Sequence, residues 1–167
     1  MSLALVVLAA VISCFVFLSR NLSRLQIQQK FESQGRRALL QFAQDVRMAS
    51  AISNPTTSSM TLTLPTSSSS MTVVYDYDSG GGTVTRTPNG SPPVPPLLVN
   101  LTSFDFTYYD SSGSPYLTPL LNYLIGIKQV SMRFNAQSSA SWNLTQPMVN
   151  YQVTSARVIL RNKPLLP

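Results

Sequence analysis

The 167-residue chain contains no histidine, one cysteine and only six acidic residues. Without histidine it cannot form the Ser-His or Cys-His pairs that activate nucleophiles in many hydrolases, and it lacks the imidazole ligands of the usual zinc sites. The cysteine, Cys14, lies inside an apolar run and has no partner for an intrachain disulfide. These absences predict that the protein is not an enzyme and needs no cofactor.

One pair of acidic residues is close in sequence: Asp76 and Asp78 precede a glycine run at residues 80–82. Together with Ser79 they offer oxygen ligands of the kind that calcium prefers. The alternative, which we favour, is a pair of solvated aspartates before a turn. The glycine run is not followed by the Lys-Ser/Thr of a phosphate-binding loop. Asp76 and Asp78 are therefore the remaining metal-ligand candidates.

Charged residues make up only 11% of the chain, and the net charge is +6. In the first fifty residues Glu32 and Asp45 face six basic residues, which are Arg20, Arg24, Lys30, Arg36, Arg37 and Arg47. Because these basic residues follow an apolar segment, anionic lipid is a simpler partner than nucleic acid. The rest of the chain is nearly neutral, which argues against a DNA-binding face, and no small-molecule substrate is expected.

Residues 3–18 form an apolar run without a charge. A membrane-spanning helix needs ~20 apolar residues, with ~17 as the lower limit. The run can be a signal-peptide core, a buried helix, or a membrane span whose beginning is missing. A signal peptide has a basic start, which this run lacks. Val11-Ile12-Ser13-Cys14 loosely matches a lipoprotein cleavage box, but the apolar residues 15–18 would be an unusual start for a lipidated protein.

Residues 19–52 contain no proline and one glycine. Apolar or small residues recur there in helical steps, as Leu22, Leu25, Phe31, Gly35, Leu39, Phe42, Val46 and Ala49. Asn54-Pro55 ends this pattern, so one helix is predicted up to about Ile52, roughly 75 Å long at ~1.5 Å per residue. We expect a helical segment at residues 1–53 and a head at residues 54–167.

The apolar pattern changes near Ser19, from apolar all round to apolar on one face. The first part, residues 1–19, is expected to lie in lipid or among other helices. Its predicted membrane and assembly residues are Leu3, Leu5, Val7, Leu8, Val11, Ile12, Phe15 and Leu18. The second part is expected to pack on the head through Leu39, Phe42, Val46 and Ala49.

The head is predicted to be rich in β-strands, because apolar and polar residues alternate along it. The expected inward faces are Met60, Leu62 and Leu64; Met71, Val73, Tyr75 and Tyr77; Phe104, Phe106 and Tyr108; Val130, Met132 and Phe134; and Ala156, Val158 and Leu160. Residues 83–87 can return as a hairpin after the glycine run. An antiparallel sheet or small sandwich on an amphipathic helix gives the α+β class.

This arrangement resembles the type IV pilin superfamily. Residues 1–10 are similar to the part of the pilin helix that follows its Phe-Thr-Leu-x-Glu segment. Residues 41–49, with Asp45-Val46-Arg47, resemble the helix end of J-type (W-type) minor subunits. Residues 101–110 with Ser-Ser-Gly, and later residues 127–134 and 158–162, resemble the family's strands. The basic leader, cleavage site and glutamate are expected in frame upstream of Met1.

The resemblance implies a structural minor subunit of a type IV pilus, a DNA-uptake pilus or a type II secretion pseudopilus, which initiates or caps the filament. Its partners would be other minor and major subunits, through the N-terminal helix, and inner-membrane lipid. It implies a single-pass bacterial inner-membrane protein with an extracytoplasmic head. Arg20, Arg24 and Lys30 alone would place the head in the cytoplasm, but the family's leader supplies cytoplasmic positive charge. The alternative is a membrane- or lipid-anchored extracytoplasmic binding domain that uses its sheet or residues 88–96.

Overall fold

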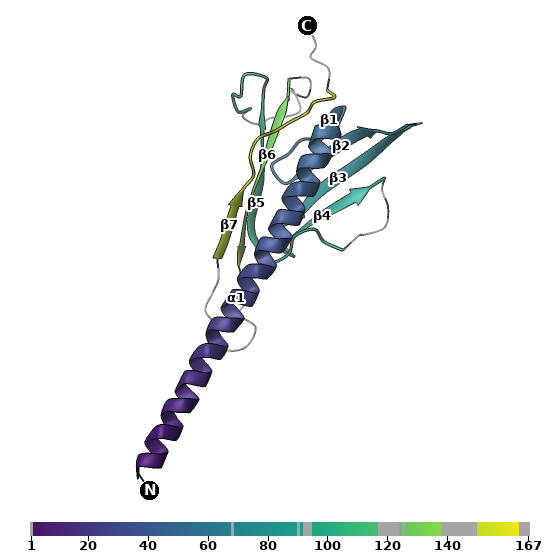
Figure 1. Ribbon diagram of the computed structural model, residues 1–167. Coiled ribbons are helices and arrows are strands. Elements are labelled where there is room, and N and C mark those ends of the chain that lie inside the picture. Colours follow the sequence, from purple (N-terminus) through teal and green to yellow (C-terminus); the bar gives the residue numbers. More distant parts are fainter. Residues whose placement is uncertain are drawn as a thin grey trace.

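A computed structural model of the chain describes residues 2–67, 69–89, 91, 95–116, 124, 126–137 and 150–163. Side chains at positions 2, 3, 20, 23 and 24 are outside the described set. Within these ranges the chain forms a long helix and two four-stranded antiparallel sheets (Figure 1). The predicted α+β class is therefore confirmed.

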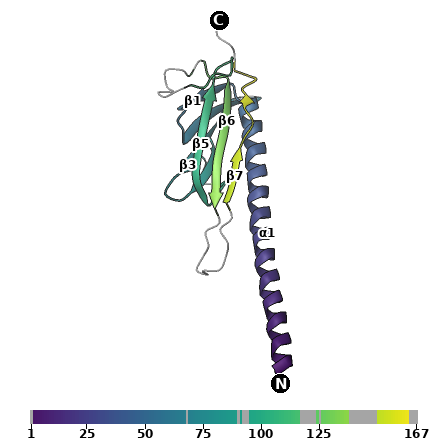
Figure 2. The same ribbon diagram turned by 90° about the vertical axis from the view of Figure 1, so that its left-hand side faces the viewer.

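Helix α1 (Ser2–Met48) has 47 residues, so it is roughly 70 Å long at ~1.5 Å per residue. Its N-terminal half extends away from the sheets, while its C-terminal half lies along them (Figures 1 and 2). The prediction that the helix continues to about Ile52 is wrong. After Met48 the chain turns, and the Ser50 N–H donates to the Thr63 carbonyl at 2.8 Å. This bond draws the following residues into a sheet.

The first sheet has the order β1 (Ala51–Ser53), β2 (Ser59–Pro65), β3 (Ser70–Asp78) and β4 (Thr83–Pro88). Strand β1 lies within the segment that was predicted to be helical. Ile52 is the one buried residue of β1, and its position also fits the helical repeat. Three residues with one buried side chain are too few to show the alternation that predicts a strand. The predicted strands around β2 and β3 and their hairpin with β4 are confirmed.

The second sheet has the order β5 (Leu101–Tyr109), β6 (Gln129–Gln137) and β7 (Asn150–Thr154), with β8 (Val158–Ile159) also paired to β6. The inward faces predicted for β5 and β6 are confirmed. Strand β7 was not predicted, because none of its side chains is fully buried. The inward orientation predicted for Ala156 is wrong: this residue is exposed, since the chain leaves the sheet between β7 and β8.

The core lies where the two sheets meet the C-terminal half of α1. Phe42 from the helix lies between Tyr75 of the first sheet and Phe106 of the second, with ring centroids 6.0 Å apart in each case. The predicted helical stripe is not buried along its whole length. Leu22 and Leu25 belong to this stripe, but both side chains are exposed. Both belong to the N-terminal half of α1, which extends away from the sheets (Figure 2).

Candidate functional site

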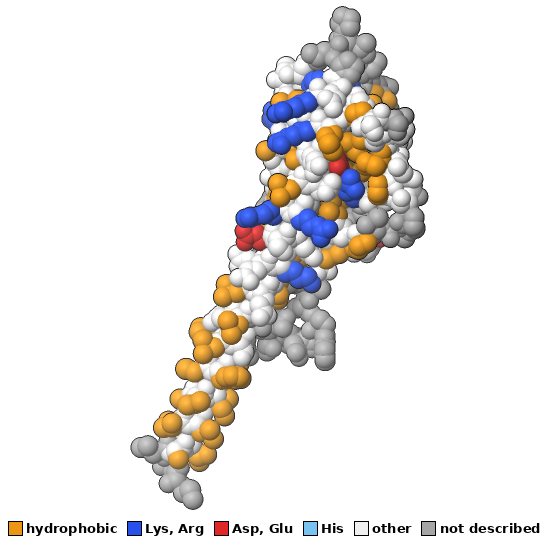
Figure 3. Space-filling view, turned by 45° about the vertical axis from the view of Figure 1, so that its right-hand side comes forward, with side chains coloured by type: hydrophobic (Ala, Val, Ile, Leu, Met, Phe, Trp, Pro, Cys, Tyr) orange, Lys and Arg blue, Asp and Glu red, His pale blue; other side chains and the backbone are white. Residues whose placement is uncertain are grey.

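The N-terminal part of α1 has no contact that buries it. Every described side chain at residues 4–19 is exposed. The large apolar ones are Leu5, Val6, Val7, Leu8, Val11, Ile12, Phe15, Val16, Phe17 and Leu18. They include the predicted assembly residues except Leu3, whose side chain lies outside the described residues. Hydrophobic side chains accordingly cover this end of the helix in Figure 3.

Burial begins along α1 at Ile27 and Phe31, well after the change of pattern near Ser19. Between residue 19 and Ile27, the side chains of Leu22, Leu25 and Gln26 are exposed and Asn21 is half-buried. Within the described residues, no helix combines the length and apolar character required to span a bilayer.

The C-terminal half of α1 packs into the head. Phe42, Val46 and Ala49 are fully buried, and Leu39 is half-buried against the core. Ala38 is fully buried too, although it was not among the predicted packing residues. It lies one turn before Phe42, so helical spacing would have placed it on the same face.

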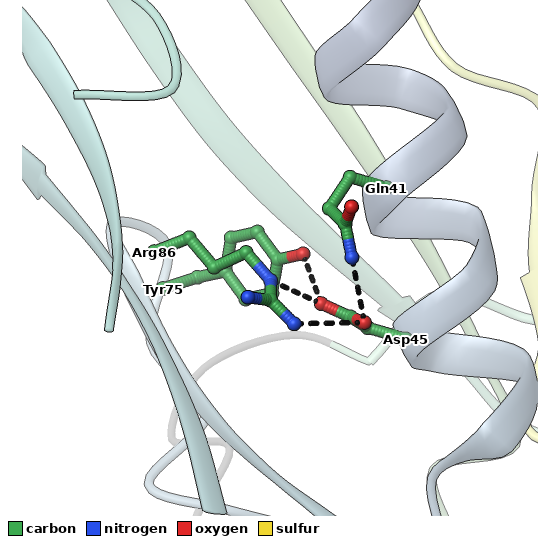
Figure 4. A network of polar contacts seen from close by, with 4 residues as sticks. All are labelled: Gln41, Asp45, Tyr75 and Arg86. Atoms are coloured by element: carbon green, nitrogen blue, oxygen red, sulfur yellow. Dashed lines mark hydrogen bonds and ion pairs between the residues drawn. The ribbon is translucent and has the colours of Figure 1, made fainter. Parts of the chain in front are cut away.

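A charged network joins this buried face to the first sheet (Figure 4). Asp45 is 1% exposed, and both of its carboxylate oxygens accept hydrogen bonds. Oδ2 accepts from the Tyr75 hydroxyl and from Arg86 Nε, each at 2.6 Å. Oδ1 accepts from Arg86 Nη2 at 3.1 Å and from Gln41 Nε2 at 3.2 Å. The helix is thereby bonded to β3 and β4 at one point.

The electrostatics of this network favour a structural role. Burial, followed by the neighbouring Asp45 charge, raises the pKa of the Tyr75 hydroxyl above its ordinary value of 10.0. The hydrogen bond to Asp45 raises the pKa of Arg86. Tyr75 therefore stays neutral and Arg86 stays charged, so neither is prepared to exchange a proton near neutral pH. A paired, fully hydrogen-bonded carboxylate of this kind holds two elements together.

Asp45 and Arg47 belong to the same short step at the end of the helix. The structure separates the two residues: Asp45 faces the sheet, and Arg47 is exposed. The spacing in the sequence could have predicted that Asp45 is buried. Asp45 is next to Val46 and one helical turn from Phe42 and Ala49, which places it on the apolar face. An acidic residue on a buried face requires a basic partner.

The candidate metal ligands Asp76 and Asp78 point outward from β3. The Asp78 carboxylate accepts a hydrogen bond from the Gly80 N–H at 2.9 Å, which stabilises the turn into β4. Among the described residues, no three His, Cys, Asp or Glu side chains come together in a group that could hold a metal ion. The other predicted binding surface, at residues 88–96, lies partly outside the described residues, since positions 90 and 92–94 are not included.

No protein-family model matches the chain, and no curated protein matches it in sequence.

Proposed function

We propose that this protein is a structural filament subunit, a minor pilin or pseudopilin, whose N-terminal helix packs among the helices of other subunits. The observation that carries the proposal is the exposure of every described side chain at residues 4–19 on a helix that continues without interruption into the head. The assembly surface and the head are thus two ends of one rigid element.

The exposed apolar surface of the N-terminal part of α1 must be buried by other molecules. Ten large apolar side chains at residues 5–18 are between 39% and 70% exposed. Covering them would gain on the order of 10 kcal/mol in transfer free energy. An exposed apolar surface of this extent marks contact with lipid or protein. Because it surrounds the helix, several neighbours must contribute to the cover, as in a bundle of subunit helices or in a membrane.

The attachment of the head supports the same function. Phe42 and the Asp45 carboxylate bind α1 to both sheets, so the head has a defined orientation on its helix. A subunit with this construction displays its head at a set position on a filament surface. The Asp45-Val46-Arg47 step, which resembles that of J-type minor subunits, now has a physical role for its aspartate in this chain.

The exposed apolar surface also supports a proposed location. Before assembly, the apolar part of α1 lies in the bacterial inner membrane, with the head on the extracytoplasmic side. After assembly, the same side chains contact the helices of other subunits. The pilus and the secretion pseudopilus are both compatible with this geometry, because no feature in the described part of the head is specific to one of the two machines.

The proposal is tested by photo-crosslinking in source cells. The full chain carries benzoylphenylalanine at Phe15, which does not touch the head. We expect crosslinks to other proteins that share a long apolar N-terminal helix, and their loss on Leu8→Glu or Ile12→Glu substitution. As a control, the probe at Thr102, an exposed residue of β5 in the head, should not give the same products. Crosslinks to lipid alone would contradict a filament subunit and would support an anchored binding domain.

A further inference from the structure

A groove of about 450 Å³ follows the C-terminal half of α1 on the side that faces β7 and β8. One helical stripe forms its first side: Arg36, Leu40, Ala43 and Arg47, in steps of four, three and four. The segment that ends β7 and leads to β8, including Arg157, forms the other. Leu40 is 66% exposed between the two arginines, whereas Ala38, Phe42 and Val46 in the same half of α1 are fully buried.

The arginines of the helical stripe are available to a partner. Arg47 is exposed and forms no ion pair within the described residues. Arg36 lies 3.6 Å from Glu32, but both side chains are largely exposed, so this pair is weak. Arg157 is different, since its guanidinium donates to the Gly113 carbonyl at 3.1 Å and covers the Tyr109 ring. Basic side chains follow this half of α1 in Figure 3.

A second copy of this chain is a poor occupant, because it has few acidic groups to offer. Its net charge is +6, with six acidic residues. Four of the six are engaged elsewhere in the chain: Asp45 with Arg86, Asp105 with Arg133, and Asp78 and Asp110 with turn residues. A fifth, Glu32, lines the groove itself beside Arg36. Two copies would bring like charges together, which disfavours association.

Lipid headgroups are also a poor occupant. At ~1.5 Å per residue, Arg36 lies roughly 27 Å and Arg47 roughly 43 Å along the helix from Leu18, where the apolar run ends. A bilayer surface at the end of that run would not reach the groove. The remaining occupant with suitable chemistry is an acidic protein surface.

We propose that this groove docks an acidic surface of a different subunit of the same assembly, with an apolar side chain against Leu40 and carboxylates at Arg36 and Arg47. This inference rests on the proposed function. The two arginines are eleven residues apart, or roughly 16 Å along the helix. A partner helix matches this separation when its own acidic residues are eleven apart and a leucine lies between them. Assembly through this groove places an acidic subunit of a different kind beside this basic chain.

The test uses the full chain in neutral nanodiscs and a fluorescent 20-residue helical peptide. The peptide has two glutamates eleven residues apart with a leucine between them, and a matched peptide carries glutamines instead. We expect the glutamate peptide to bind at low salt and the glutamine peptide to bind about tenfold more weakly. Arg36→Gln with Arg47→Gln should weaken binding about fivefold to tenfold, and Leu40→Gln should weaken it similarly.

The matched control is Lys30→Gln with Arg37→Gln, which removes the same charge from another face of α1. These two positions are seven residues apart and lie on one face of their own. The control should bind the glutamate peptide as the unchanged chain does. Equal losses in the two double variants, or equal binding of the two peptides, would overturn the proposal, because either result indicates attraction by net charge alone.

Two further measurements separate the other occupants. Binding to added phosphatidylglycerol vesicles that depends on Arg36 and Arg47, without peptide binding, would assign the groove to lipid and overturn the proposal. Self-association of the chain that depends on the same arginines would assign it to a second copy, with the same consequence. Ile12→Glu, which disrupts the proposed helix assembly, should leave peptide binding unchanged, so failure of the filament function and failure of the groove are distinguishable.

Discussion

The Arg86 guanidinium meets the Asp45 carboxylate side-on, with Nε 2.6 Å from Oδ2 and Nη2 3.1 Å from Oδ1. This bidentate contact joins residues that are 41 positions apart and belong to different elements. The Tyr75 hydroxyl completes the arrangement from the neighbouring strand. The carboxylate therefore sets where the helix lies on the first sheet, in addition to the apolar packing around Phe42.

Replacing Asp45 by Ala should destabilise the protein by ~3–5 kcal/mol, because it leaves the Arg86 charge and the Tyr75 hydroxyl without their acceptor. The control is Asp105→Ala, which breaks a more exposed pair with Arg133 and should cost at most about 1 kcal/mol. Urea unfolding of the full chain in neutral detergent measures both changes. A similar loss in the two variants would contradict the structural role assigned to Asp45.

Replacing Phe42 by Ala should lower the free energy of unfolding by ~3–5 kcal/mol, because its fully buried ring contacts both sheets. Phe15→Ala removes the same side chain from the exposed end of the same helix. It should leave the unfolding of the head unchanged while it reduces assembly. Thermal unfolding followed by near-ultraviolet circular dichroism reports on the head. If Phe15→Ala unfolds the head and Phe42→Ala does not, the roles of the two halves are reversed.

Replacing Gly82 by Ala should destabilise the β3–β4 turn by about 2 kcal/mol or more. Gly82 has φ +59°, and an added Cβ would lie 2.7 Å from the Leu101 carbonyl oxygen, which is backbone and cannot move aside cheaply. Gly80→Ala in the same turn is the matched control, since its Cβ would meet only the end of the Asp78 side chain, at 3.3 Å. Urea midpoints should therefore fall for Gly82→Ala and change little for Gly80→Ala.

Stability should fall at alkaline pH, and Tyr108 should contribute to the fall. Burial raises the pKa of the Tyr108 hydroxyl above its ordinary value of 10.0. The folded state then holds this proton more tightly than the unfolded chain does. The contribution is fully present below about pH 10 and is lost as the pH rises toward the folded-state pKa.

Unfolding free energies measured between about pH 9 and pH 12 check this expectation. Tyr108→Phe should give a shallower decline above pH 10 than the unchanged chain, because the titrating group is gone. The substitution also removes the hydrogen bond to the Thr56 carbonyl, at 2.8 Å, so its stability should be lower at neutral pH. Parallel curves with a constant offset would show that only this hydrogen bond matters.

Much of the fold could be predicted because its signals are local. The strands around Met60, Val73 and Phe106 alternate clearly, since one face of each is more buried than the other. The strand around Met132 has the same apolar alternation in sequence, although Ser131 on its other face is buried too. The missed strands lack that contrast: β1 has three residues, and β7 has no fully buried side chain. Their identity depends on pairing with β2 and β6, which are distant in sequence.

The sequence by itself determined that a long helix would be apolar all round at one end and one-faced at the other, because helical spacing is read from neighbours three and four residues away. Only the tertiary structure decided where the head begins to cover that helix, at Ile27 and Phe31 instead of near Ser19. It alone also decided that Asp45 is buried and Arg47 exposed. The first outcome depends on β7, whose Tyr151 stacks on Phe31, and the second on β3 and β4, whose Tyr75 and Arg86 bind Asp45. These strands are distant from the helix in sequence, and no local pattern contains that information.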